Sequence, residues 1–346
     1  MLWDQPGNYK TSTHRQINTT MIPKKLRLFS SALLMTLACF LQASAQAQTW
    51  PGQTIKIIVP FTPGTGMDTI ARTVSPKLSE RLGQPVIVQN TPGASGNIGA
   101  DNVAKAAADG YTVLMGANTM LIAAQLYKNV PFDPVTDFSP VSMAAYGTLM
   151  LVSNPKSGIK SMNDLIALGK AKPGSISYGS PGIGTPHHMA MELFKSQAGI
   201  FMLHVPYKGT AGYLQDLLGG ELQTGFLPVH VAQGFVTSGK LNALAVGSAK
   251  RHPVAPNVAT IDELGLKGVN VDMWYAFFVP GKTPAPVVNR LHDEIAAVLS
   301  LSEVKSVLAK AGLDAASSSP AELNGIVGKD YQRWGSVIKR NAIVAE

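Results

Sequence analysis

Short apolar runs alternate along the chain with segments whose apolar residues recur at helical spacing. The run "TIKIIV" precedes a helical pattern over residues 68–82 that Gly83 ends, "PVIVQN" precedes "GNIGADNVAKAAA", and "YTVLMG" precedes "TMLIAAQLY". Strands that alternate with crossover helices form parallel sheets with helices on both faces. The first part of the chain is therefore predicted to be an α/β unit with a doubly wound sheet.

A second α/β series follows two strand-like runs that lie close together in "FSPVSMAAYGTLMLVSNPKSG". It contains "SISYGS", the helical "TPHHMAMELFKSQAG", "FMLHVPYKG", "AGYLQDLLGG", "ELQTGF" and "LNALAVGS". The run "VNVDMWYAFFVPG" resembles a strand that returns to the first unit, and the remaining residues have helical patterns. We therefore predict two lobes joined by two crossings: residues 48–150 begin lobe 1, 151–272 form lobe 2, and 273–346 complete lobe 1.

The first 47 residues have the pattern of an N-terminal extension followed by a cleaved secretory signal. Three basic residues precede the apolar run 28–41, and small residues allow cleavage after Ala45 or Ala47. Met21 lies just before this signal, so Met1 and Met21 are both candidate start residues. The mature protein is expected to be exported.

Cys39 is the only cysteine of the sequence. Cleavage would therefore leave a protein without disulfides, thiolate nucleophiles or cysteine metal sites. A lipoprotein anchor at Cys39 is the alternative, which is disfavoured because Thr36 stands where such signals usually carry Leu and apolar residues continue beyond the cysteine.

Charge disfavours a nucleic-acid partner, and hydropathy disfavours a membrane-spanning segment in the mature chain. Cleavage removes five basic residues and one acidic residue, which lowers the net charge from +8 to +4. The remaining chain has no Lys/Arg cluster of the kind that binds nucleic acid, so we expect no nucleic-acid partner. No run outside the first fifty residues is apolar and long enough to span a bilayer.

The stretch "VPFTPGTGMDTIAR" joins the first predicted strand to its helix. Thr65 and Asp68 resemble a variant capping box at the helix start, and Gly64 and Gly66 let a backbone approach a ligand without a Cβ in the way. Free N–H groups and the helix dipole at such a position attract an anion without an Arg. The alternative is an ordinary strand-to-helix turn in which Asp68 only caps its own helix.

A second loop of similar construction lies in the second series. "SISYGSPGIGTPHHM" ends a strand at about Tyr178, passes through Gly182 and Gly184, and starts a helix with Thr185 as N-cap and Pro at the first helical position. Two helix N-termini built alike, one in each lobe, favour a small acid bound between them.

Catalytic and cofactor motifs are incomplete. The Gly-Ile-Gly of the second loop lacks the last glycine of the dinucleotide fingerprint, no phosphate-loop Gly-Lys-Ser/Thr occurs, and "GASGN" lacks the last glycine of the serine-hydrolase elbow. We therefore expect neither an enzyme nor a bound cofactor.

Histidines follow the second loop. His187 is either a donor to a ligand oxygen or a hydrogen-bonded surface histidine. His188 and Glu192 share a helix face at i,i+4 spacing, which favours an ordinary solvated or capping pair over a metal site because a third ligand is missing. By topology, "GASGN" and "GANTM" belong on the same rim of lobe 1, and "HVPYKG" is a further strand-to-helix loop in lobe 2. Trp274 and Tyr275, which begin the returning strand, are predicted either to line the cleft or to be buried in the hinge.

Several motifs together resemble those of the Bug family (TctC-like) of periplasmic solute-binding proteins, the receptor components of tripartite tricarboxylate transporters. These motifs are "VPFTPGTGMDTIAR", "PGASGNIGADNVAKAAADGYTVLMG", "PFDPVTDFSPVS", "YGSPGIGTPHHMA", "HVPYKG", "DLLGG" and "GKLNALAV", in the family's order from about Trp50 to the C-terminus. The resemblance implies an α/β, two-lobed periplasmic binding protein of the type II (Venus flytrap) class that closes on a small organic acid. It also implies TctA/TctB-like membrane subunits as partners and a periplasmic location, and we expect a monomer.

In the family, one carboxylate is held by two loops that correspond here to residues 61–68 and 180–185, largely through main-chain amides and two bridging waters. Together with the rim and strand-to-helix loops described above, these loops give the candidate ligand-binding residues Phe61, Pro63, Gly64, Thr65, Gly66, Asp68, Ser95, Asn118, Ser180, Gly182, Gly184, Thr185, His187 and Tyr207.

This chain departs from the family pattern at two loops. It has P-G-T-G-M-D over residues 63–68 in place of P-G-G-x-x-D, and Q-N-T-P-G over 89–93 in place of E-N-R-P-G. The identity of the acid is thus not carried over, and an aromatic acid, a dicarboxylate and an amino acid all stay open. A periplasmic sensor that presents its ligand to a signalling partner is the alternative function.

Overall fold

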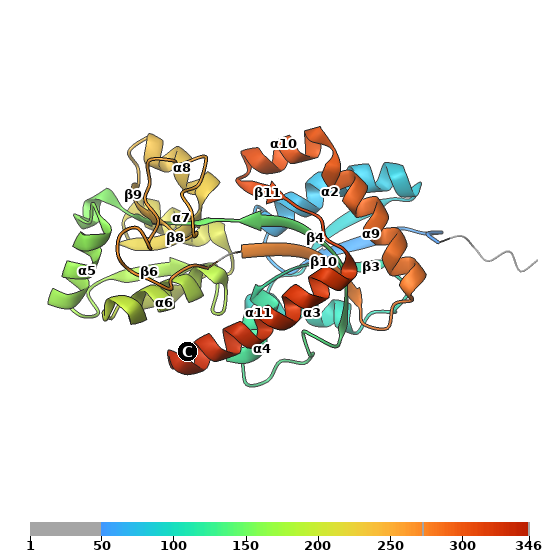
Figure 1. Cartoon of the computed structure of the whole chain (residues 1–346), viewed down its shortest axis with the longest axis horizontal. Helices are drawn as coiled ribbons and strands as arrows, with labels where there is room; N and C mark the ends of the chain where they lie inside the picture. Colours follow the sequence, from blue (N-terminus) through green and yellow to red (C-terminus); the bar gives the residue numbers. More distant parts are fainter. Residues whose placement is uncertain (1–49, 272, 345–346) are drawn as a thin grey trace, which may run out of the picture. The chain divides into compact units, whose positions relative to one another are not determined.

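Two mixed β-sheets, each covered by helices on both faces, organise the folded chain (Figure 1). The computed structural model describes residues 50–271 and 273–344, and residues from Trp50 onward form a single unit by their contacts. We call the elements built on the six-stranded sheet lobe 1 and those built on the five-stranded sheet lobe 2. The predicted N-terminal extension and signal peptide, residues 1–47, lie outside the described residues.

Lobe 1 contains a six-stranded sheet in the order β11-β4-β10-β3-β1-β2. The strands are β1 (Ile55–Val59), β2 (Val86–Asn90), β3 (Thr112–Ala117), β4 (Phe138–Gly147), β10 (Met273–Pro280) and β11 (Leu313–Ala315). The parallel arrangement predicted for the first three strands is confirmed, because β1 pairs in parallel with both β2 and β3. The returning strand β10 inserts between β3 and β4 and is antiparallel to both. The prediction that the last part of the chain is helical throughout is wrong at β11, which extends the sheet beside β4.

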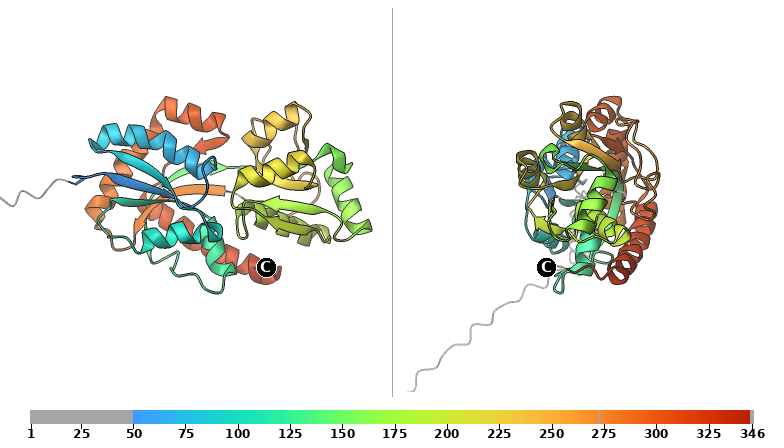
Figure 2. Two further views of the ribbon diagram at one scale, coloured as in Figure 1. Left: turned by 180° about the vertical axis from the view of Figure 1, so that it is seen from behind. Right: turned by 90° about the vertical axis from the view of Figure 1, so that its left-hand side faces the viewer.

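Helices cover both faces of this sheet. They are α2 (Gly66–Leu82), α3 (Asn97–Ala104), α4 (Thr119–Leu126), α9 (Ala285–Ser300), α10 (Ser302–Lys310) and α11 (Pro320–Arg340), with a 3₁₀ turn η1 (Ala94–Gly96). Ile57 packs in the cluster with α2, α9 and α10, whereas its neighbour Ile58 packs in the cluster with α3, α4 and α11. Figure 2 (left) shows α2 and α11 on opposite sides of the sheet. Two covered faces explain why the first strand is apolar without alternation.

Lobe 2 contains a five-stranded sheet in the order β7-β6-β8-β5-β9. The strands are β5 (Leu149–Ser153), β6 (Ser177–Ser180), β7 (Leu203–Pro206), β8 (Thr224–Pro228) and β9 (Asn242–Val246). The helices are α5 (Met162–Ala171), α6 (Pro186–Ala198), α7 (Thr210–Gly219) and α8 (Val229–Thr237), with a 3₁₀ turn η2 (Pro155–Ser157). Apolar residues of α5 and α6 cover one face, and those of α7 and α8 cover the other.

The chain passes between the sheets twice. Thr148 alone separates β4 in lobe 1 from β5 in lobe 2, and a longer segment returns the chain from β9 to β10. In both lobes, strand ends that lead into helices face the same region. This arrangement brings the two glycine-containing loops of the sequence to one place.

Candidate binding pocket between the lobes

The loop between β1 and α2 begins its helix with a side-chain cap. Thr65 is the N-cap, and its Oγ1 accepts a hydrogen bond from the Asp68 N–H at 3.4 Å. The Asp68 carboxylate reaches back to the N–H of Gly64 at 3.0 Å rather than to Thr65, so the predicted capping box is displaced by one residue. Gly64 is exposed and has φ +85°, a left-handed conformation that favours glycine.

Gly66 lines the pocket and also lies against β10. A Cβ at this position would lie 2.8 Å from the Tyr275 hydroxyl oxygen, so the missing side chain makes room for an aromatic ring of β10. Tyr275 is buried, and burial raises the pKa of its hydroxyl. The hydroxyl is therefore protonated, and it donates to Met273 Sδ at 3.9 Å, a weak sulfur acceptor at the edge of the pocket.

Asp68 is turned away from the pocket, toward Arg72 and Asn90. Its carboxylate accepts hydrogen bonds from Arg72 Nε at 2.9 Å and from Asn90 Nδ2 at 2.9 Å. Burial raises the pKa of this carboxyl, but the hydrogen bonds from Arg72, the Gly64 N–H and Asn90 outweigh burial and leave the pKa below its ordinary value. Asp68 is thus an ionised residue that fixes the loop from behind.

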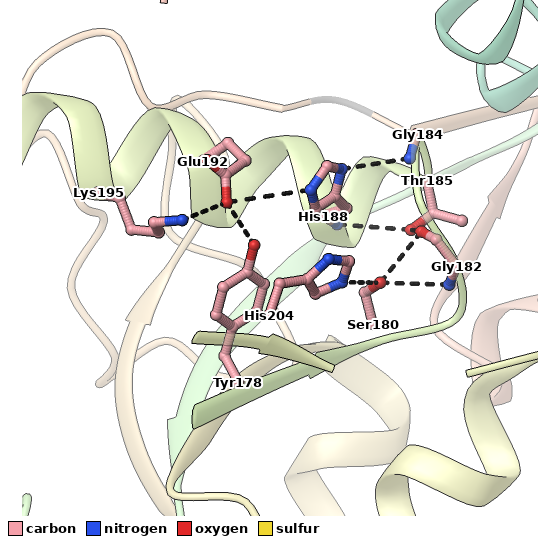
Figure 3. A network of polar contacts seen from close by, with 9 residues as sticks. All are labelled: Tyr178, Ser180, Gly182, Gly184, Thr185, His188, Glu192, Lys195 and His204. Atoms are coloured by element: carbon pink, nitrogen blue, oxygen red, sulfur yellow. Dashed lines mark hydrogen bonds and ion pairs between the residues drawn. The ribbon is translucent and has the colours of Figure 1, made fainter. Parts of the chain in front are cut away.

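The loop between β6 and α6 has the predicted cap. Thr185 is the N-cap and Pro186 the first helical residue, and the Thr185 hydroxyl accepts from the His188 N–H at 3.4 Å while donating to the Gly182 carbonyl at 2.7 Å. Gly182 and Gly184 have φ values of +148° and +78°. Figure 3 shows that Ser180 and Gly184 are bonded to His204 and His188 behind the loop, whereas Thr185 is bonded to Gly182 within it.

A small pocket lies where these two loops meet, and its lining comes from both lobes. It has an estimated cavity volume of about 40 Å³. The lining residues are Phe61, Thr65, Gly66, Met67, Ala117, Asn118, Thr119, Pro181, Thr185, Pro186, His187, Thr210, Pro228, Met273 and Tyr275. Among these described residues there is no Lys, Arg, Asp or Glu.

Five helices in the described part of the chain begin at this pocket. Lining residues stand at or next to the first residue of α2 and α4 in lobe 1 and of α6, α7 and α8 in lobe 2. The first N–H groups of a helix have no partner within the helix, and the dipole adds partial positive charge there. The pocket is therefore electropositive without a cationic side chain.

His187 is the polar side chain whose surroundings are most unusual. Its exposed fraction is 7%, it lines the pocket, and neither ring nitrogen has a hydrogen-bond partner among the described residues. Burial lowers the pKa of the imidazole from 6.5 to about 3, so the ring is neutral and offers one donor and one acceptor. The prediction of a surface histidine is wrong, while the prediction of a ligand donor stays open.

The candidate residues fall into two groups. Six of them line the pocket: Phe61, Thr65, Gly66, Asn118, Thr185 and His187. Eight do not: Pro63, Gly64, Asp68, Ser95, Ser180, Gly182, Gly184 and Tyr207.

Besides Asp68, three of the eight have side chains engaged elsewhere. The Ser180 hydroxyl contacts His204 at 2.8 Å, the Ser95 hydroxyl contacts the Tyr127 hydroxyl at 3.1 Å, and the Tyr207 hydroxyl donates to Asp216. Burial, followed by the neighbouring Asp216, raises the pKa of Tyr207 to about 12. These side chains support the loops behind the pocket.

Three lining residues were not anticipated: Thr210, Pro228 and Met273. Thr210 begins the helix after β7, and Pro228 ends β8. The rule that ligands lie beyond the carboxyl ends of strands could have identified both. Met273 starts the returning strand, whose neighbours in the sheet were not predicted.

His188 and Glu192 do not form the solvated pair that the sequence suggested. His188 is buried, with its Nε2 3.9 Å from a carboxylate oxygen of Glu192. Across the described residues, no three His, Cys, Asp or Glu side chains are grouped so as to hold a metal ion. In the same residues, no helix is long and apolar enough to cross a membrane.

Glycines mark the line along which the lobes touch. A Cβ on Gly209 would lie 2.3 Å from Thr62 Oγ1, and one on Gly182 would lie 2.8 Å from Ser95 Oγ. A Cβ on Gly312 of lobe 1 would likewise lie 2.4 Å from the Cβ of His230 in lobe 2. The absence of side chains at these positions allows the two lobes to approach closely.

Two lobes that share one pocket define the architecture of a bilobal solute-binding protein. The family model described as "Tripartite tricarboxylate transporter family receptor" (TctC) matches residues 70–343. The chain belongs to this family of solute receptors, which is not a family of enzymes. The predicted resemblance to the Bug family and the predicted two-lobed fold are both confirmed.

Individual relatives agree with this assignment. The chain is 35% identical to BugT of Bordetella pertussis over 299 residues, which cover 86% of this chain and 92% of BugT. The structure of Rhodopseudomonas palustris Rpa4515 with adipate is similar with a TM-score of 0.81 and 33% identity, covering 85% of this chain and 99% of that one. The structure of MatC from Rhodopseudomonas palustris with bound malate has a TM-score of 0.79 and 28% identity, covering 84% of this chain and all of MatC.

Proposed function

We propose that this protein is a periplasmic, monomeric receptor that binds a small organic carboxylate between its lobes and delivers it to membrane subunits of a tripartite tricarboxylate-type transporter. One observation carries the ligand class: five helix N-termini surround a pocket without a charged lining side chain. Such a site attracts an anion through backbone N–H groups and dipoles.

The donors of this site come from both lobes. In lobe 1, the N–H groups of Gly66 and Met67 belong to the first turn of α2, where helical hydrogen bonds provide no acceptor. In lobe 2, Pro186 has no N–H and the His188 N–H is taken by the cap, which leaves the His187 N–H for a ligand. A carboxylate with two oxygens matches a site whose donors lie on two facing helices.

The side chain of His187 supports the same ligand. A buried polar group without a partner costs free energy, and a bound carboxylate oxygen would accept its ring N–H. Since the ring is neutral, this contact gives a hydrogen bond without adding a full positive charge. The related structures with adipate and malate hold carboxylates, which agrees with this assignment.

Closure of the lobes explains how binding would be signalled. The ligand would contact both loops only when the lobes meet, so it would stabilise the closed state over the open one. The two crossings, at Thr148 and between β9 and β10, are the proposed hinge. Membrane subunits that recognise only the closed arrangement would then receive loaded receptor.

A thermal-shift screen of residues 48–346 tests the ligand class. The panel contains adipate, malate, aromatic acids and amino acids, each beside its neutral amide. A ligand at a hundred times its dissociation constant adds about 2.7 kcal/mol to the free energy of unfolding, which raises the melting temperature by several degrees. We expect a shift with an acid but not with its amide.

Equal shifts with acid and amide would contradict a carboxylate site. If no compound shifts the melting temperature, mass spectrometry of the supernatant from denatured protein tells whether the receptor was purified already loaded. Co-purification with TctA/TctB-like subunits in the presence and absence of the acid tests the transport role, and ligand-dependent capture by a signalling protein instead would favour the sensor.

A further inference from the structure

Two histidines stack on each other directly beneath the ligand loop of lobe 2, residues 180–185. His188 comes from α6 and His204 from β7, and their ring centroids are 4.3 Å apart at an interplanar angle of 22°. Both are buried. Figure 3 shows them between the loop on one side and Glu192 on the other.

His204 holds the start of the loop through Ser180. The Ser180 hydroxyl lies 2.8 Å from His204 Nε2, accepts from the Gly182 N–H at 3.2 Å and contacts the Gly182 carbonyl at 3.0 Å. A hydroxyl has only one proton to donate. All three contacts are satisfied if the proton of Ser180 goes to the carbonyl and His204 Nε2–H donates to the hydroxyl.

His188 holds the end of the loop directly. Its Nδ1 accepts a hydrogen bond from the Gly184 N–H at 3.2 Å, so Nδ1 carries no proton. The neutral ring then has its proton on Nε2, which faces the Glu192 carboxylate at 3.9 Å. Gly184 itself is in a left-handed conformation with φ +78°, and a Cβ there would lie 3.3 Å from Leu126 of lobe 1.

Among the described residues, the titratable groups that contact the pair are His188 and His204 themselves, Glu192 and Tyr178, which stacks on His204, while Lys170 and Lys195 line the same cavity as His188. His188 meets His204 from β7 and Glu192 from its own helix, and Glu192 in turn accepts from Lys195 at 2.6 Å and from the Tyr178 hydroxyl of β6. Burial and then Lys195 lower the pKa of His188 to about 4. Burial, followed by His188, lowers the pKa of His204 to about 3 despite the opposing effect of Glu192.

We propose that His188 is the positioning residue of the ligand loop: as a neutral acceptor it holds the Gly184 N–H, and its protonation releases the loop and weakens ligand binding. This proposal rests on the proposed function, because it assumes that the loop contacts the ligand. The mechanism is electrostatic, since a protonated Nδ1 is a donor and can no longer accept from Gly184. The loop would then lose the hydrogen bond that fixes Gly184 beside Leu126 of lobe 1.

Three variants separate positioning from general stability. His188→Leu removes the acceptor, and His188→Asn keeps one, since Asn Oδ1 is close to the position of Nδ1 but does not titrate. His252→Leu is the matched control: His252 is also buried in lobe 2, and its Nδ1 accepts from the Val254 N–H at 3.2 Å, but it does not line the pocket.

Adipate is the probe for calorimetric titration at pH 7.5. We expect His188→Leu to bind about tenfold more weakly, with wild-type affinity for His252→Leu and near-wild-type affinity for His188→Asn. Between pH 6 and 4 the affinity of the wild type should fall more steeply than that of His188→Asn. The titration of adipate itself is common to all four proteins, so this difference belongs to residue 188.

NMR of the ligand-free protein provides a readout that does not depend on adipate. We expect a ¹⁵N shift of an unprotonated Nδ1 at His188 and faster exchange of the Gly184 amide in His188→Leu than in the other proteins. Unchanged exchange, or an equal loss of affinity in His252→Leu, would overturn the proposal. If the wild-type protein binds no adipate, adipate is not its ligand. The exchange of the Gly184 amide in the ligand-free variants then still tests the role of His188.

Discussion

Gly312→Ala is predicted to weaken ligand binding from outside the pocket, by opposing closure. Gly312 lies in lobe 1 between α10 and β11, and it faces His230 of α8 in lobe 2. It has φ +60°, and a Cβ there would lie 2.4 Å from the His230 Cβ and 2.6 Å from its Nδ1. No real contact is this short, so one lobe must move away from the other.

The loss of affinity depends on whether the free-energy cost of the alanine falls on both the open and closed states or on the closed state alone. The left-handed backbone costs an alanine about 1–2 kcal/mol in the open and closed states alike, so it lowers stability but leaves affinity unchanged. Because the proposed opening would separate the lobes, the clash with His230 is expected only in the closed state, and overpacking of this kind costs about 1–3 kcal/mol. The acid identified by thermal shift should therefore bind about 5- to 150-fold more weakly.

Gly83→Ala is the matched control, because Gly83 also lies in lobe 1, has φ +66° and has no neighbour within 4 Å of its missing Cβ. Isothermal titration gives the dissociation constants, and small-angle X-ray scattering with saturating ligand reports whether the lobes close. We expect a larger radius of gyration and weaker binding for Gly312→Ala alone. Equal affinities of the two variants would refute the argument that this contact limits closure.

Three further predictions concern the loops and their histidines. Asp68→Ala removes the acceptor of three hydrogen bonds, so it should lower the free energy of unfolding by about 2 kcal/mol in urea titrations and also weaken binding of the acid. Gly184→Val strains a left-handed backbone and presses on Leu126 of lobe 1, so it should bind the acid more weakly; wild-type affinity in both variants would contradict the two-loop site. The pKa of His188 falls from 6.5 to about 4 on folding, so its contribution to stability is complete above pH 6.5 and is lost as the pH falls toward 4, because the unfolded chain takes up the proton first. Urea unfolding at pH 7.5 and 4.5 should differ by about 2 kcal/mol more in the wild type than in His188→Asn, and an identical difference would contradict a buried neutral ring.

The helix starts of the site were predictable because their chemistry is local. Thr65 and Thr185 each precede a helix by one residue and each accept from the third helical N–H, as the spacing alone indicates. The end of α2 was predictable for the same reason, because Gly83 adopts the left-handed conformation of a C-cap. Where a residue and its partner are separated by a few positions, sequence patterns describe the contact well.

Side-chain directions were not predictable in the same way. Asp68 and Ser180 belong to the correct loops, but they point to Asn90 and His204, more than twenty residues away along the chain. Gly66 makes room for Tyr275, which a single sequence does not place beside it. These contacts depend on which strands become neighbours, and the insertion of β10 between β3 and β4 is a tertiary outcome.

In this pocket the main chain of the loops and the lining side chains have different tasks, and this division bears on how such a receptor achieves specificity. If the carboxylate is held by helix N-termini, its binding depends on the main chain and tolerates changes in most side chains. Discrimination among acids then falls to the other side chains that line the pocket, such as Met273, Tyr275 and Pro228, which come from β10 and β8. Pro228 offers no N–H, and the other two present a thioether and a protonated hydroxyl. Since no lining side chain of this pocket carries a charge, the second carboxylate of a dicarboxylate such as adipate would have to be held by another of the five helix N-termini rather than by a cation.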